Sequence, residues 1–209
     1  KLMVRKIFFI RHGIRLDFED SSWNRNARRP HDPPLSRNGI IQADETADLL
    51  KEDSGIGNIF SSPFLRALQT ADIIAEKLGL LVKVEHGFSE FLNGNWFNTP
   101  PKIMDKEEMI LEFDHIDTQY MTITTPVFPE TTESGDVFRR TKYVLETIIR
   151  NYIGTIAIVA HEANLREAAT LLLGDSGIMD YGMCAVNCLK KIDDRCYLDP
   201  ASIFHFSVT

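Results

Sequence analysis

The chain has 209 residues, of which 44% are hydrophobic and 25% charged, as in an ordinary globular domain. Its formal net charge of −7 argues against nucleic acid or an anionic membrane as the main partner, and no apolar run is long enough to span a bilayer. The three cysteines lack paired C-x-x-C spacing, which favours buried, reduced thiols over a zinc site and indicates a cytoplasmic protein.

The first predicted element is a buried strand that ends in basic residues. The apolar run from Ile7 to Ile10 is followed directly by Arg11-His12-Gly13-Ile14-Arg15. Open α/β sheets bind their ligands beyond the carboxyl ends of such strands. Arginine presents a planar fork of donors to phosphate oxygens, and histidine can act as a nucleophile near neutral pH. We interpret this segment as a phosphate site attacked by His12, although a solvated strand end would also explain it if taken alone.

The next predicted elements are a long loop over residues 17–34, a helix over 37–51, a strand over 58–61 and a helix over 63–78. The loop is rich in arginine and proline, and it forms either a cationic lid or a solvated surface. Ser36 and Ser62 are the predicted N-caps of the two helices, and Gly79 ends the second. Arg66 lies in the first turn of that second helix, where free N–H groups already favour an anion.

A strand over 80–84 precedes Glu90, which is flanked by aromatic residues. Desolvation there would raise the pKa of this carboxyl and suit a proton donor, although a solvated strand-edge carboxylate is the alternative. Residues 93–132 are predicted to be mostly loop, with a short helix over 105–113.

The last third of the chain repeats the opening pattern. A long helix is predicted over 134–152, with Arg140 on its solvated side, and the apolar strand over 155–161 ends at His161. A helix over 164–173 and strands over 184–192 and 202–207 follow. Alternating strands and helices predict one α/β domain over residues 1–209, a three-layer sandwich with a mostly parallel central sheet and loop insertions at about 17–34 and 93–132.

Three motifs carry a resemblance to a known family. Arg11-His12-Gly13 after an apolar strand, the Ser-x-x-x-Arg-x-x-x-Thr-Ala pattern from Ser62 to Ala71, and Val159-Ala160-His161 resemble the signatures of the histidine phosphatase superfamily, which includes the cofactor-dependent phosphoglycerate mutases. The resemblance implies a phosphoglycerate mutase-like fold and a metal-independent phosphatase without a cofactor.

The same resemblance implies a role for each matching residue. His12 would become a phosphohistidine, while Arg11, Arg15, Arg66 and His161 would bind the phosphoryl oxygens. Glu90 would protonate the leaving group and then deprotonate water. Glu162, directly after His161, occupies the place of the proton donor in the acid phosphatase branch and is therefore a rival acid.

The residues after the first motif discriminate between branches. Phosphoglycerate mutases continue as Arg-His-Gly-x-Ser-x-x-Asn, whereas this chain has Arg15 and Phe18 at those two places. Arg-His-Gly-x-Arg, followed by Asp17, resembles instead the phosphatase domains of the TULA (suppressor-of-T-cell-receptor-signalling) proteins and ecdysteroid-phosphate phosphatase. In that group an acidic residue usually stands at the place of Ile14, so a contact that would orient Arg15 is expected to be missing.

Three hypotheses remain. The first is a phosphomonoesterase that acts on a phosphotyrosine-like or steroid-like ester, carried by a small molecule or a phosphoprotein. Trp23, Phe88, Phe91 and Trp96 could wall its pocket, with core packing as the alternative. The second is a phosphoglycerate-type mutase, and the third is a catalytically weak scaffold that binds a phosphorylated partner. Composition leaves the oligomeric state open, with a homodimer as one alternative.

Overall fold

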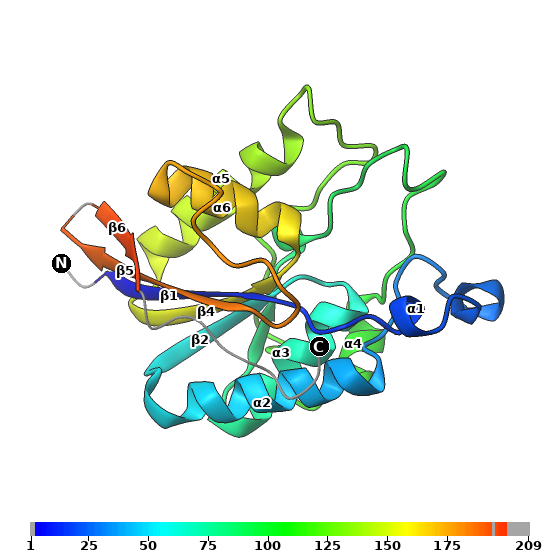
Figure 1. The fold of residues 1–209 in the computed structure, drawn as a ribbon, viewed down its shortest axis with the longest axis horizontal. Coiled ribbons are helices and arrows are strands. Elements are labelled where there is room, and N and C mark those ends of the chain that lie inside the picture. The colour runs from blue at the N-terminus through cyan, green and yellow to red at the C-terminus, as the bar shows by residue number, and fades with distance from the viewer. Residues whose placement is uncertain (1–2, 194, 200–209) are drawn as a thin grey trace.

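A computed structural model describes residues 3–193 and 195–199, and a six-stranded sheet forms its centre (Figure 1). The strands lie in the order β3-β2-β4-β1-β5-β6. The four strands from β3 to β1 run parallel, and β5 and β6 are antiparallel additions at the β1 side. Their bounds are β1 Val4–Arg11, β2 Ile56–Ser61, β3 Val82–Val84, β4 Gly154–Ala160, β5 Val186–Ile192 and β6 Arg195–Leu198.

Helices cover both faces of the sheet, which makes three layers. In Figure 1, α2 and α3 lie below the sheet and α5 and α6 lie above it. Shorter helical segments lie in the connections between the main elements. The bounds are α1 Leu16–Glu19, η1 Trp23–Asn26, α2 Arg37–Asp53, α3 Leu65–Leu78, η2 His86–Phe88, α4 Lys106–Glu112, α5 Asp136–Asn151 and α6 Glu162–Leu173. None of the helices in the described part of the chain is both long and apolar enough to cross a membrane.

Strand β1 is buried on both faces because its side chains alternate between two hydrophobic clusters. Phe8 and Ile10 pack into the cluster that includes residues of α2 and α3. Ile7 and Phe9 pack into the cluster that includes residues of α5 and α6. A central strand with this double burial has a fixed position, and the chain that leaves its carboxyl end is therefore well anchored.

The predicted three-layer α/β fold with a mostly parallel sheet is confirmed. Strand β6 was not predicted, because the four residues Arg195–Leu198 alternate only between exposed and half-buried positions. The predicted strand over 202–207 lies outside the described residues. Helix α3 begins at Leu65 with Phe64 as its N-cap, so Ser62 is not the cap that the sequence suggested.

Candidate active site

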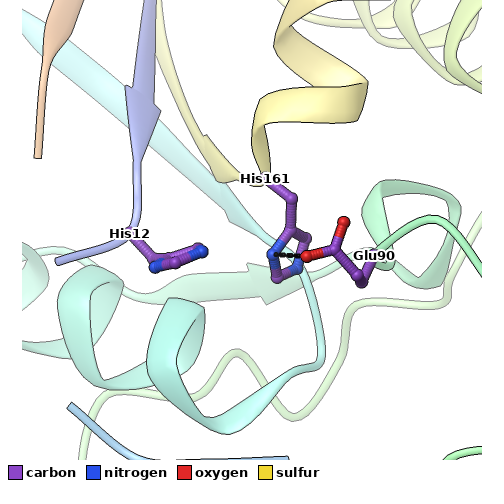
Figure 2. Close-up of side chains that lie close together, drawn as sticks. All are labelled: His12, Glu90 and His161. Carbon is purple, nitrogen blue, oxygen red and sulfur yellow. Dashed lines mark ion pairs between the residues drawn. The ribbon is translucent and has the colours of Figure 1, made fainter. Parts of the chain in front are cut away.

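The structure brings His12 and His161 together at the carboxyl ends of neighbouring parallel strands. His12 directly follows β1 and His161 directly follows β4, and the His12 amide donates to the carbonyl of Ala160 at 3.1 Å. The two imidazole rings have centroids 5.1 Å apart, and both side chains are buried. Figure 2 shows that Glu90, from the segment after η2, points into the same group.

The His12 ring has a defined tautomer. Its Nδ1 lies 2.8 Å from the carbonyl oxygen of Gly13, and a carbonyl only accepts, so Nδ1 carries the proton. The lone pair is therefore on Nε2. Burial lowers the pKa of His12 well below its ordinary value, and the nearby charge of Arg66 lowers it further. The free ring is neutral and presents a nucleophilic nitrogen.

Arg66 joins the members of this group. Its Nε donates to Nε2 of His12 at 3.2 Å, and its Nη2 contacts Oε2 of Glu90 at 3.0 Å and Nδ1 of His161 at 3.2 Å. The side chain is only 2% exposed, and its Nη1 is buried without a hydrogen-bond partner. The buried Nη1 group of Arg66 therefore still has N–H donors free, and an anion could accept hydrogen bonds from them.

The hydroxyl of Ser62, which was predicted to cap a helix, contacts the ring of His161 instead. Ser62 Oγ lies 2.8 Å from Nε2 of His161. Nδ1 of the same ring faces both Nη2 of Arg66, at 3.2 Å, and Oε2 of Glu90, at 3.3 Å. The ring of Phe64 packs edge-on against His161, with centroids 5.3 Å apart. Burial lowers the pKa of His161, although the Glu90 carboxylate opposes this shift.

Glu90 is ionised in the free protein, contrary to the prediction of a raised pKa. Burial alone would raise the pKa of this carboxyl, but its contacts with His161 and Arg66 outweigh burial and hold the pKa well below its ordinary value. The carboxylate is 3.3 Å from Nδ1 of His161, and its other oxygen accepts from the amide of Phe91. The prediction was wrong because it considered only the aromatic neighbours of Glu90 in the sequence.

Arg11 and Arg15 are each held by a carboxylate. Nη1 of Arg11 lies 3.0 Å from Glu162, while its Nε is buried without a partner. Nε and Nη2 of Arg15 both donate to Asp17, so Asp17 supplies the orientation that Ile14 cannot. Glu162 also contacts Nε of Arg166 at 2.8 Å. Glu162, the alternative proton donor, thus pairs with two arginines.

The backbone around His12 needs glycine because two segments approach closely. A Cβ on Gly13 would lie 2.6 Å from the carbonyl oxygen of Gly39 near the start of α2, and a Cβ on Gly39 would lie 2.2 Å from the carbonyl oxygen of Ile14. Thr70 adds a polar tie, because its hydroxyl donates to the Arg66 carbonyl and accepts from the Gly13 amide. These contacts fix His12 relative to the start of α3.

Within the described residues, His12, Glu90 and His161 lie close enough to share a metal ion, since their ligand atoms are within 4.8 Å of one another. Arg66 competes with such an ion, because its guanidinium already donates to a ligand atom of each. A fixed positive charge in that place favours an anion over a cation.

An apolar cavity of about 410 Å³ adjoins this group. Phe64, which packs against His161, forms part of its wall together with Leu92, Ile103 and Phe128, and Ser89 lines it beside Glu90 in the chain. Among the described residues, the lining contains no lysine, arginine or carboxylate, and its titratable side chain is His86.

The aromatic residues suggested as pocket walls do not line this cavity. Phe88 packs in the core instead, while Phe91 contacts the exposed Trp96 edge-on. Trp23 lies in the turn η1.

Comparisons with known proteins show what the chain is similar to. The sequence model of the histidine phosphatase superfamily (branch 1) matches residues 7–198. Ubiquitin-associated and SH3 domain-containing protein A from Homo sapiens is 35% identical over 158 residues, which are 69% of this chain and 23% of that protein. Ecdysteroid-phosphate phosphatase from Drosophila melanogaster is 26% identical over 207 residues, which are 81% of this chain and 27% of that protein.

A solved structure supports the fold. The ecdysone phosphate phosphatase from Bombix mori, solved in complex with tungstate, superposes with a TM-score of 0.78. The two share 19% identity, and the match covers 98% of this chain and 96% of that one. The chain thus spans nearly all of a solved phosphatase but only about a quarter of the two curated relatives.

Proposed function

The chain belongs to branch 1 of the histidine phosphatase superfamily, and we propose that it hydrolyses phosphate monoesters through a phosphohistidine at His12. One observation carries the proposal. A fully buried arginine, Arg66, contacts the lone-pair nitrogen of His12 and keeps one of its own nitrogens, Nη1, without a partner. A phosphoryl group bound between Arg66 and His12 would contact the nucleophilic nitrogen of His12 and the guanidinium of Arg66 at the same time.

The first step forms the phosphoenzyme. Nε2 of His12 gives its lone pair to phosphorus as the ester P–O bond breaks, and the electron pair stays on the leaving oxygen. Arg66, Arg11 and Arg15 neutralise the phosphoryl oxygens, and His161 lies beside them as a hydrogen-bonding group. Arg11 and Arg66 each have a buried unpartnered nitrogen for this purpose.

Glu90 carries the proton. Because Glu90 is ionised in the free protein, the proton arrives with the substrate, whose monoanion loses it with a pKa of about 6. Glu90 passes this proton to the leaving oxygen. In the second step Glu90 takes a proton from water, the water oxygen bonds to phosphorus, and the P–Nε2 bond breaks, which returns the electron pair to His12. Glu162 is the weaker candidate because its carboxylate contacts Arg11 and Arg166, whereas Glu90 contacts Arg66, which also contacts the nucleophilic nitrogen of His12.

The cavity beside Phe64 supports an ester of an apolar or aromatic alcohol, such as a phosphotyrosine-like or steroid-like substrate. Its volume of about 410 Å³ is in the range of small-molecule pockets. Among the described residues that line it, no lysine or arginine is present to pair with a charged leaving group such as phosphoglycerate. The printed names of two similar proteins, an ecdysteroid-phosphate phosphatase and an ecdysone phosphate phosphatase, are in keeping with this substrate class.

We further propose that residues 1–209 act as one domain, without a metal, in the cytoplasm. The position of Arg66 inside the His12–Glu90–His161 group favours metal independence. Cys184 and Cys196 form no disulfide, as expected in a reducing compartment.

Turnover of p-nitrophenyl phosphate by the wild type and His12→Ala, with free phosphate measured, tests the proposal. We expect phosphate release by the wild type and a loss of about 10³-fold or more in His12→Ala, since the nucleophile is removed. His115→Ala is the matched control, because His115 pairs with Asp72 outside this group. Equal turnover in His12→Ala would exclude His12 as nucleophile, and no turnover in any variant would favour the phospho-ligand scaffold.

A further inference from the structure

Glu90 lies on a segment without regular secondary structure, between η2 and the long connection to α4. Side chains that act in catalysis need to be held within a fraction of an ångström, and loops provide this only when neighbouring groups fix them. Arg66 cannot supply that support alone, because its donors are the ones that a bound phosphoryl group would use. The Glu90 segment therefore needs an anchor that does not touch the substrate.

A buried ion pair provides such an anchor. Arg140, on α5, donates from Nε and Nη2 to the two carboxylate oxygens of Glu130, at 2.5 and 2.9 Å. Both residues are buried, with exposed fractions of 8% and 3%. Two parallel bonds between a guanidinium and a carboxylate fix the relative orientation of both groups.

The pair holds the backbone on both sides of Glu90. Nη1 of Arg140 donates to the carbonyl of Gly87 at 2.8 Å, and its Nη2 donates to the carbonyl of Glu90 itself at 3.1 Å. Glu130 accepts from the amide of Leu92 at 2.9 Å. The Glu90 backbone is thus tied to α5 upstream and downstream of the carboxylate, by groups that make no contact with His12.

We propose that Arg140 and Glu130 are positioning residues that set the place of the Glu90 carboxylate for proton transfer. The inference rests on the proposed phosphatase function. Burying an ion pair costs desolvation that its attraction only roughly repays, so stability alone is a weak reason for the pair. The bonds to the carbonyls of Gly87 and Glu90 supply a geometric reason.

The sequence predicted that Arg140 is solvated, but its position on α5 explains why it is buried. It lies three residues after Val137 and four before Val144, both buried on the same face of α5. Arg139, its neighbour, is exposed and pairs with Asp136. Arg139→Lys is therefore a matched control on the same helix.

The test compares two aryl esters in Arg140→Lys, Glu130→Gln and Glu90→Gln. p-Nitrophenyl phosphate has a weakly basic leaving group that departs with little help, whereas the phenol of phenyl phosphate has a pKa of about 10 and needs a proton. We expect Arg140→Lys and Glu130→Gln to lose about 10-fold in kcat/KM with phenyl phosphate and less than about 3-fold with p-nitrophenyl phosphate. Glu90→Gln should show the same selectivity with a larger loss, and Arg139→Lys should show none.

Equal losses with both esters would overturn the proposal, because a merely structural pair would not distinguish leaving groups. Unchanged kinetics in both variants would overturn it as well. Glu130→Gln preserves shape and one acceptor, so it decides the question if Arg140→Lys does not fold. A wild type that hydrolyses neither ester would refute the proposed function together with this inference. His12-dependent turnover with unselective variants would refute this inference alone.

Discussion

Replacing Arg66 by lysine is the sharpest perturbation of the site, because it keeps the charge and removes the fork. The guanidinium reaches His12, Glu90 and His161 from two of its nitrogens and leaves Nη1 unpartnered. A single ammonium cannot serve these directions at once. Arg66→Lys should therefore bind a phosphoryl group through fewer charged hydrogen bonds while the fold, which packs α3 through other residues, remains intact.

The expected loss follows from the number of bonds. A hydrogen bond to a charged group contributes about 1.5–3 kcal/mol, so losing two of them costs about 3–6 kcal/mol of transition-state stabilisation. At about 1.36 kcal/mol per tenfold, kcat/KM for p-nitrophenyl phosphate should fall about 10²- to 10⁴-fold.

Steady-state kinetics measures this loss, and circular dichroism confirms that the variant is folded. Arg150→Lys, an exposed site at the end of α5, is the control and should retain wild-type kcat/KM. A loss smaller than about 10-fold in folded Arg66→Lys would refute the idea that Arg66 carries the phosphoryl charge.

Three further predictions concern pH and stability. The pKa of His12 is lowered, and the substrate gives up its proton near pH 6. We therefore expect kcat/KM to peak in mild acid and to fall above about pH 7. A maximum above about pH 8 would contradict the assignment of the substrate monoanion as the source of the proton. Burial raises the pKa of Asp32 to about 6, so the folded protein binds a proton at this group more tightly than the unfolded chain, and the resulting stability is lost as the pH rises from about 4 to 6. Asp32→Asn should therefore have a free energy of unfolding up to about 3 kcal/mol higher than the wild type at pH 7. Urea titrations should show equal stability near pH 3. The buried Glu85 carboxylate accepts hydrogen bonds from the Tyr120 hydroxyl and the Ile123 amide, both at 2.7 Å. Glu85→Gln should therefore lower the free energy of unfolding by about 2–6 kcal/mol. An unchanged melting temperature would exclude a stabilising role of these bonds.

The sequence predicted the elements that position the site, because each has a strong local pattern. His12 and His161 follow apolar strands, and Arg66 lies at the start of an amphipathic helix, so their convergence follows from a parallel sheet. The state of Glu90 could not be predicted in this way. Its ionisation depends on Arg66 and His161, which are 24 and 71 residues away in the chain.

Other features depend equally on contacts between distant segments. Arg140 is buried because Glu130 and two carbonyls receive its donors, although the apolar spacing of α5 held a signal for that burial. The apolar cavity is formed by segments far apart in the chain, and Trp23, Phe88, Phe91 and Trp96 lie outside its lining. Composition indicates how many aromatic residues are present but not which loops face each other.

Trapping the phosphoenzyme tests the central claim most directly. Rapid quenching of the wild type with a radiolabelled phosphate ester should leave label on the peptide that contains His12, stable in alkali and lost in acid, as expected for a P–N bond. His12→Ala should carry no label. Turnover without any trapped label, or label on a different residue, would contradict the account.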